Sequence, residues 1–135
     1  MKLDDKDEKI LSMLRKNART SNVEVAKAVE LTEGAVRNRI DHLVKDGVIR
    51  RFTIETSGGA SYGIVMLKAK GETKKMMTEL SSAGLASEAY EISGEYDGCA
   101  ILEGATLEEV DAKIDAIRKL KSVADTKTFI PFRKW

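Results

Sequence analysis

A short run of small residues, Thr56-Ser57-Gly58-Gly59-Ala60-Ser61, divides the sequence into two halves with different hydrophobic patterns. Residues of this kind are typical of a flexible linker. Before the run, helical spacing of apolar residues predominates; after it, segments with strand and helix spacing alternate. A chain of 135 residues can hold two small domains. We therefore expect one domain over residues 1–56 and a second over residues 57–135.

The first half predicts three helices, of which the first covers about residues 4–17. The residues expected to cap them are Asp4, Ser21 or Asn22, and Thr32. Asp7 stands at the third position of the first helix, and Gly47 would end the third. Residues 48–54 then read as a strand. The residues expected in the core are Ile10, Leu11, Leu14, Val23, Val25, Ala26, Val29, Val36, Ile40, Leu43 and Val44.

Three residues, 30–32, separate the second helix from the third, which is the spacing of a helix-turn-helix. Arg can bind guanine and Asn can bind adenine through paired hydrogen bonds, so Arg37 and Asn38 are candidates for base reading. An ordinary three-helix core with a charged surface would show the same spacing. The full set expected at DNA is Thr32, Glu33, Gly34, Arg37, Asn38, Arg39, Asp41, Lys45, Arg50 and Arg51.

The net charge of the whole chain does not indicate DNA binding, but the charge of one segment does. The net charge is +1, but residues 37–51 hold five basic and two acidic residues, enough for a phosphate-binding patch. No apolar run approaches the ~20 residues of a membrane span, and the charged N-terminus excludes a secretory signal. The single cysteine, Cys99, excludes an internal disulfide or a cysteine-rich zinc site. We expect a cytoplasmic protein without cofactor, metal or membrane contact.

The second half predicts the order strand, helix, strand, strand, helix, strand. The expected ranges are 62–70, 73–82, 86–93, 99–103, a helix opened by Thr106, and 125–132. This βαββαβ order is ferredoxin-like: an antiparallel sheet with both helices on one face. The residues expected under the helices are Met76, Met77, Leu80, Leu107, Val110, Ile114, Ile117 and Leu120. The other sheet face needs a partner, so we expect a dimer.

An ordered set of short motifs resembles the Lrp/AsnC, or feast/famine, family of regulators. The residues that carry the resemblance are Leu3-Asp4-x-x-Asp7-x-x-Ile10-Leu11, Asn17-Ala18-Arg19-x-Ser21, Val25-Ala26, Val36-x-x-Arg39-Ile40-x-x-Leu43 and Gly47-Val48-Ile49. The resemblance implies an α+β protein with a winged helix-turn-helix and a βαββαβ amino-acid-sensing domain. It implies a homodimer on double-stranded promoter DNA, often assembled to an octamer, with a recognition helix at 32–46 and a linking strand at 49–55.

The resemblance also implies an amino-acid effector site between dimers, at the loop joining the second and third strands. The family's Gly-x-x-Asp signature matches Gly94-Glu95-Tyr96-Asp97. A glycine loop exposes backbone N–H groups to a carboxylate, and Asp97 can pair with an ammonium. Thr126 and Thr128 share a face of the last strand and could close the pocket. Without the resemblance, the same loop reads as an ordinary hairpin turn.

Two other functions are compatible with parts of the sequence. The two-domain order also resembles the sirohaem decarboxylases, enzymes that use histidine and arginine; here the single histidine, His42, lies in the helix expected at DNA. No nucleophile with a partner base, P-loop or dinucleotide motif is present. An amino-acid sensor or interaction module that no longer binds DNA is the third possibility, and the basic residues of 37–51 weigh against it.

Overall fold

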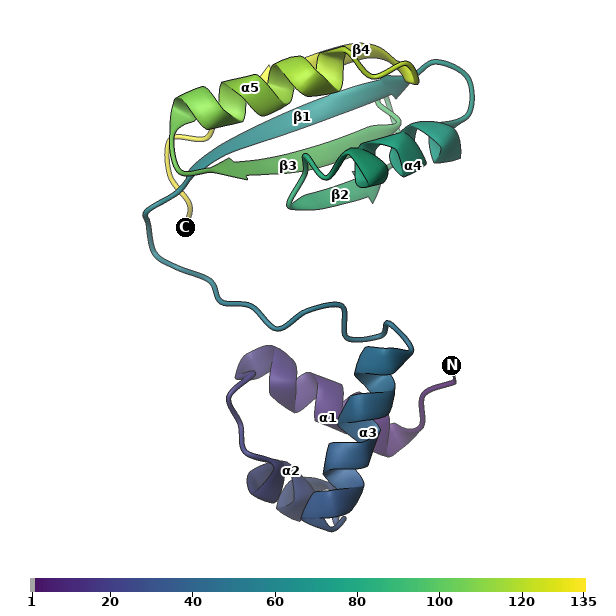
Figure 1. Cartoon of the computed structure of the whole chain (residues 1–135), viewed down its shortest axis with the longest axis vertical. Helices are drawn as coiled ribbons and strands as arrows, with labels where there is room; N and C mark the ends of the chain where they lie inside the picture. Colours follow the sequence, from purple (N-terminus) through teal and green to yellow (C-terminus); the bar gives the residue numbers. More distant parts are fainter. Residues whose placement is uncertain (1) are drawn as a thin grey trace. The chain divides into compact units, whose positions relative to one another are not determined.

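Three helices form the first of two units in the computed structural model, which describes residues 2–135 (Figure 1). They are α1 (Asp5–Lys16), α2 (Asn22–Val29) and α3 (Glu33–Lys45). The first unit ends at Glu55 and the second begins at Thr56. No helix among residues 2–135 has the length and apolarity that a membrane span requires.

Each helix of the first unit begins at an expected cap. The side chains of Asp4, Ser21 and Thr32 each accept a hydrogen bond from the backbone N–H three residues further on. At α1 the cap is reciprocal, because the Asp7 carboxylate accepts a bond from the Asp4 N–H at 3.2 Å. Gly47, with φ of 74°, follows the end of α3 as expected.

One face of each helix supplies the core of the first unit. Its buried residues are Ile10, Leu11, Val25, Ala26, Val29, Val36 and Leu43. The expectation that Val23 and Val44 are buried was wrong, since they are 53% and 45% exposed. Both lie to the side of the stripe that packs inward: Val25, Ala26 and Val29 define it on α2, and Val36 and Leu43 on α3.

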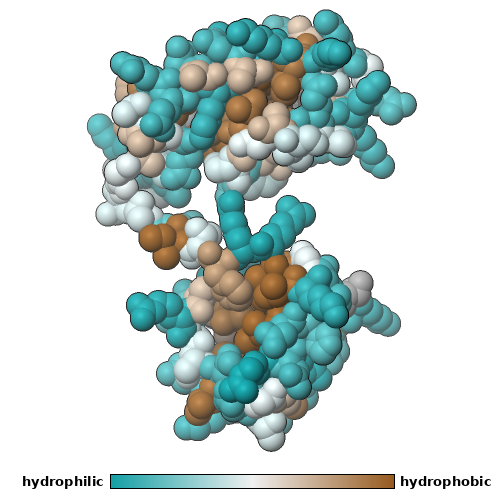
Figure 2. Space-filling view, viewed as in Figure 1, coloured by the Kyte–Doolittle hydropathy of each residue, from teal (hydrophilic) through white to brown (hydrophobic). Residues whose placement is uncertain are grey.

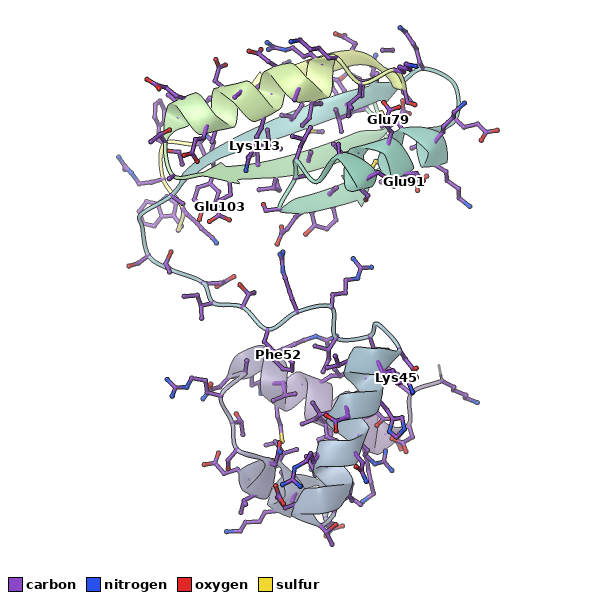
Figure 3. All side chains as sticks on the ribbon, viewed as in Figure 1. Lys45, Phe52, Glu79, Glu91, Glu103 and Lys113 are labelled. Atoms are coloured by element: carbon purple, nitrogen blue, oxygen red, sulfur yellow. The ribbon has the colours of Figure 1, made fainter. Side chains whose placement is uncertain are left out.

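The strand expected over residues 48–54, and the linking strand at 49–55, are absent from the described chain. Residues 50–56 form neither helix nor strand. Phe52 and Ile54 alternate along this segment and are 56% and 81% exposed (Figure 3 labels Phe52). A strand is defined by a ladder of hydrogen bonds to a neighbour, and nothing within residues 2–135 supplies one to this segment. The strand-like pattern is present without its partner.

The second unit has the predicted βαββαβ order. Its elements are β1 (Ser61–Ala69), α4 (Thr73–Ala83), β2 (Glu88–Glu91), β3 (Gly98–Gly104), α5 (Leu107–Arg118) and β4 (Val123–Phe129). All neighbouring strands are antiparallel, in the order β2-β3-β1-β4. Both helices lie on the same face of this sheet (Figure 1).

The helix-covered face of the sheet holds the second core. Val65 pairs with Ala100 on one side and Thr128 on the other, which fixes the inward register. The buried residues are Val65, Leu67, Met76, Leu80, Ala100, Leu102, Val110, Ile114, Ile117 and Val123. Hydrophobic atoms are visible between the polar surfaces of α4 and α5 (Figure 2). Leu107 corrects one expectation: it opens α5, lies outside the inward stripe and is 54% exposed.

The opposite face of the sheet carries apolar side chains that neither α4 nor α5 covers. Ile64 lies between Ile101 and Phe129 in the strand register, and Met66 pairs with Cys99. These residues are half-buried or exposed, Phe129 at 48%. Because strand residues alternate between faces, this set is the outward counterpart of the core. We call Ile64, Met66, Cys99, Ile101 and Phe129 the open face.

Candidate DNA-binding face and effector loop

The outward face of α3 brings together five of the residues expected at DNA. Gly34, Arg37, Asn38, Asp41 and Lys45 are all exposed, and their three- and four-residue spacing places them on one side of the helix (Figure 3 labels Lys45). The other side of α3 is anchored in the core by Val36 and Leu43, both fully buried. A helix held in this way presents a fixed polar face.

Two further residues expected at DNA serve the local structure of α3. The Thr32 hydroxyl accepts the Ala35 N–H at 3.1 Å and is therefore the N-cap. Glu33 forms an exposed ion pair with Arg37 one turn along the helix. A guanidinium has five N–H donors, so Arg37 retains donors for another acceptor. A Cβ added at Gly34 would meet no atom within 4 Å, so a larger side chain has open space at this position.

Arg39, one of the basic residues expected at DNA, binds two carboxylates within the helical unit. Its Nη1 donates to both carboxylate oxygens of Asp4, at 2.8 and 2.7 Å, and to Oδ1 of Asp7 at 3.0 Å. The hydrogen bond from Arg39, then that from the Asp7 N–H, lowers the pKa of Asp4 to about 2. The same carboxylates raise the pKa of Arg39. Arg39 therefore joins α3 to the start of α1.

Two lysines of α1 were not anticipated from the sequence. Lys6 Nζ donates to the Val29 carbonyl at 2.6 Å, and Lys9 Nζ donates to the Ala28 carbonyl at 2.7 Å. Both carbonyls are at the C-terminal end of α2, where unpaired acceptors and the helix dipole favour a cation. These contacts span about twenty residues, so no local pattern reveals them. Of the remaining basic candidates, Arg50 and Arg51 lie exposed beyond α3.

The loop between β2 and β3 is held against β1 by Asp97. The Asp97 N–H donates to the Leu67 carbonyl at 2.9 Å, and its Oδ2 accepts the Ala69 N–H at 2.9 Å. Gly94 has φ of 126°, which favours glycine strongly at the turn. The Lys68 ammonium lies 5.5 Å from the centre of the Tyr96 ring. Asp97 is thus a structural anchor whose Oδ1 accepts no hydrogen bond from residues 2–135.

Thr126 and Thr128 lie on β4, across β1 from this loop. Thr126 pairs with Leu67 of β1 on one side, and the Leu67 carbonyl accepts the Asp97 N–H on the other. Thr126 and Asp97 therefore lie on either side of Leu67. At the usual strand spacing, their backbones are about 10 Å apart. Both threonines are half-buried on the helix-covered side, and the Thr128 hydroxyl has no hydrogen-bond partner among the described residues. Glu95 is exposed at the loop tip.

A cavity of about 720 Å³ lies elsewhere on the second unit. Its walls include Ile64 and Ile101 of the open face and the tail residues 130–134, and none of its lining residues belongs to the 94–97 loop. His42 is exposed on α3, with Nδ1 2.8 Å from the Asn38 carbonyl. No cluster of three metal-binding side chains occurs within residues 2–135.

Comparison with known proteins places both units in one family. Residues 3–50 match a family described as winged helix-turn-helix DNA-binding. The HTH-type transcriptional regulator LysM of Sulfurisphaera tokodaii is 37% identical over 98% of this chain and 97% of its own length, and LysM of Saccharolobus solfataricus is 34% identical over 98% and 96%.

Solved structures agree with these relatives. LrpC of B. subtilis is 25% identical with a TM-score of 0.64, over 100% of this chain and 98% of that one. A feast or famine regulatory protein of M. tuberculosis, solved with L-methionine, shares the fold at 19% identity and a TM-score of 0.73, over 99% and 95%. The expected α+β fold, a winged helix-turn-helix followed by a βαββαβ domain, is confirmed. The chain belongs to the Lrp/AsnC family of transcription regulators, with a DNA-binding helix-turn-helix.

Proposed function

We propose that this regulator binds double-stranded promoter DNA as a homodimer in the cytoplasm, with α3 in the major groove. The observation that carries the proposal is the outward face of α3, where Arg37, Asn38 and Lys45 are exposed. Arg37 and Asn38 would bind base edges, and Lys45, Arg50 and Arg51 would bind phosphates. Thr32, Glu33, Gly34 and Asp41 would border the groove. No catalytic residue enters this proposal, since His42 is engaged within α3.

Substitution of Arg37 and Arg51 tests the two kinds of DNA contact. Arg37→Ala is expected to weaken binding to the chain's own upstream DNA by about 5- to 150-fold, and to change binding to random DNA little, because it removes a base contact of about 1–3 kcal/mol. Arg51→Ala is expected to weaken both equally and to lower the salt slope by about 0.9. Fluorescence anisotropy at several salt concentrations measures both quantities.

The matched control for these variants is Lys75→Ala, which removes one charge from an exposed position on α4. It is expected to bind both DNAs as the unsubstituted chain does. Equal losses on upstream and random DNA for Arg37→Ala and Arg51→Ala would overturn the division of roles. Equal binding of the unsubstituted chain to both DNAs at ~150 mM salt would overturn sequence-specific regulation itself.

The homodimer is proposed from the open face. Its half-buried apolar side chains continue across neighbouring strands, from Ile101 through Ile64 to Phe129. A second copy would cover this face with the same residues, as two-fold symmetry requires. The extended segment 50–56 would gain a ladder in the same dimer, since its exposed Phe52 and Ile54 have strand alternation. Further assembly to an octamer is part of the proposal.

An amino-acid effector is proposed at the 94–97 loop. Gly94 opens the loop, Asp97 has one carboxylate oxygen available for an α-ammonium, and Glu95 and Tyr96 border it. Thr126 and Thr128 would close the site together with a neighbouring dimer. The L-methionine complex of the M. tuberculosis protein, which shares the fold, supports an amino-acid ligand of this class. The acidic residues of the loop would favour a basic side chain.

A thermal-shift screen of the twenty amino acids tests the effector site. The cognate amino acid at 100 times its Kd is expected to stabilise the protein by ~2.7 kcal/mol, measured as a raised melting temperature. Asp97→Asn keeps an oxygen for the Ala69 N–H but loses the charge, so it is expected to abolish the shift. The control Asp111→Asn, on the exposed side of α5, is expected to keep it. A screen in which no amino acid raises the melting temperature would overturn the site.

A further inference from the structure

The ion cluster of Asp4, Asp7 and Arg39 links two helices that are distant in sequence. Arg39 is three residues after Val36 and four before Leu43, both fully buried, so it stands at the edge of the core stripe of α3. The exposed residues Arg37 and Asn38 precede it directly on the outward side. Arg39 therefore projects towards α1 while its neighbours in sequence project towards solvent.

The cluster joins one buried carboxylate, that of Asp7, to the half-exposed side chain of Asp4 through Arg39. Asp7 is 5% exposed, and a buried carboxylate is costly unless hydrogen bonds satisfy it. Its oxygens accept from Arg39 Nη1 at 3.0 Å and from the Asp4 N–H at 3.2 Å. Asp4, in turn, caps α1 and takes two bonds from the same guanidinium nitrogen. The first turn of α1 and the middle of α3 are thus fixed by one shared set of bonds.

We propose that Arg39 is a positioning residue for DNA recognition: anchored by Asp4 and Asp7, it fixes the orientation of α3 and so of Arg37 and Asn38. The inference rests on the proposed DNA binding through α3. It assigns to the two acidic residues a role that their charge alone would oppose, because a carboxylate repels phosphate. Base contacts depend on the placement of side chains, so a loosened α3 would lose specific binding before non-specific binding.

Asp4→Asn separates positioning from simple electrostatics by the sign of its effect. Asn caps a helix as well as Asp does, so α1 keeps its start while the charge that binds Arg39 is lost. Positioning predicts about tenfold weaker binding to upstream DNA, the equivalent of one charge-assisted hydrogen bond, with random DNA unchanged. Electrostatics alone predicts equal or tighter binding. The control Asp5→Asn removes the same charge one residue away, where no ion pair forms with residues 2–135.

Arg39→Gln tests whether Arg39 itself touches phosphate. A positioning residue leaves the slope of log affinity against log salt unchanged, whereas a phosphate contact lowers it by about 0.9. In the double variant with Asp4→Asn, positioning predicts no further loss beyond Arg39→Gln alone. All binding is measured well below the melting temperature of each variant, so that unfolding does not contribute. A lowered slope, or additive losses, would overturn the proposal.

Amide hydrogen exchange without DNA keeps this proposal separate from the proposed function. Asp4→Asn is expected to speed exchange along α3, and Asp5→Asn is expected to leave it unchanged. If the unsubstituted chain fails to bind its upstream DNA, the proposed function fails, and the exchange result still decides whether Asp4 anchors α3. If the chain binds but Asp4→Asn binds equally well or α3 exchanges at the same rate, the positioning role is overturned.

Discussion

Replacing Leu43 by Ala is expected to unfold the helical unit at temperatures where the sheet unit remains folded. Leu43 is fully buried among α1, α2 and α3, and loss of its side chain is expected to cost about 2–5 kcal/mol. Domains of this size are stable by only about 5–15 kcal/mol. The two cores are made of separate residues, within 10–43 and 65–123. The space left by the missing Leu43 side chain is therefore expected to destabilise only the helical unit. DNA binding is expected to disappear as the helical unit melts.

Differential scanning calorimetry with residue-specific hydrogen exchange measures this separation. The reciprocal variant Leu102→Ala empties a fully buried site in the other core and is expected to lower only the second transition. For a unit of this length, each kcal/mol lowers the melting temperature by about 4–8 °C. A single transition that moves equally in both variants would contradict two independently folding units.

The helix caps explain why most of the fold could be predicted from the sequence. A cap is a local signal, since the donor and acceptor are three residues apart, as with Asp4 and Asp7 or Thr32 and Ala35. Apolar periodicity gave the element type in the same way, within one helix or strand. The βαββαβ order followed from these local signals because few topologies satisfy them.

The errors lie where burial depends on which face another element covers. Val23, Val44 and Leu107 are apolar residues in helices, yet each is about half exposed because it lies beside the stripe that packs inward. Periodicity gives the direction of a stripe but not its width. Their exposure could be learned only once the neighbouring elements were in place.

The site residues show the same limit more strongly. Arg39 looked like one of five basic residues near DNA, but its partner Asp4 is 35 residues away in the sequence. Asp97 was predicted to bind a ligand, but one of its carboxylate oxygens accepts a hydrogen bond from the N–H of Ala69, 28 residues away. Charge and residue type identify what a side chain can do; the tertiary fold decides which acceptor or donor it meets.

The segment 50–56 shows a third limit of prediction from the sequence. Its residues have the pattern of a strand, but a strand needs a neighbouring strand to bond with, and the pattern does not say where that neighbour comes from. Phe52 and Ile54 alternate as in a strand, yet they are exposed, and no ladder forms within residues 2–135. The open face is similar: its apolar residues lie side by side on neighbouring strands, but neither α4 nor α5 packs over them. A second copy of the chain would supply a partner to both features, and the proposed dimer would thereby link the fold to DNA binding.

Replacing Ile64 by Lys is expected to produce a monomer and to reduce affinity for upstream DNA by at least ~100-fold. Ile64 is central on the open face, between Ile101 and Phe129, and a cation buried there in a dimer would have no partner. A monomer would lose the effective concentration of its second helix-turn-helix, which is worth about 10²–10⁴ in affinity. Lys can extend its charge into water from the half-buried site, so the monomer itself is expected to stay folded.

The added charge makes this loss of affinity unambiguous, because one more cation would by itself strengthen binding to DNA. Analytical ultracentrifugation gives the oligomeric state, circular dichroism confirms the fold, and anisotropy gives the affinity for upstream DNA. Ile64→Leu, which keeps the face apolar, is the matched control and is expected to behave as the unsubstituted chain. A folded Ile64→Lys variant that stays dimeric would show that the chain dimerises elsewhere. A folded monomer that binds DNA with undiminished affinity would show that one helix-turn-helix is sufficient, and that dimerisation through the open face is not needed for DNA binding.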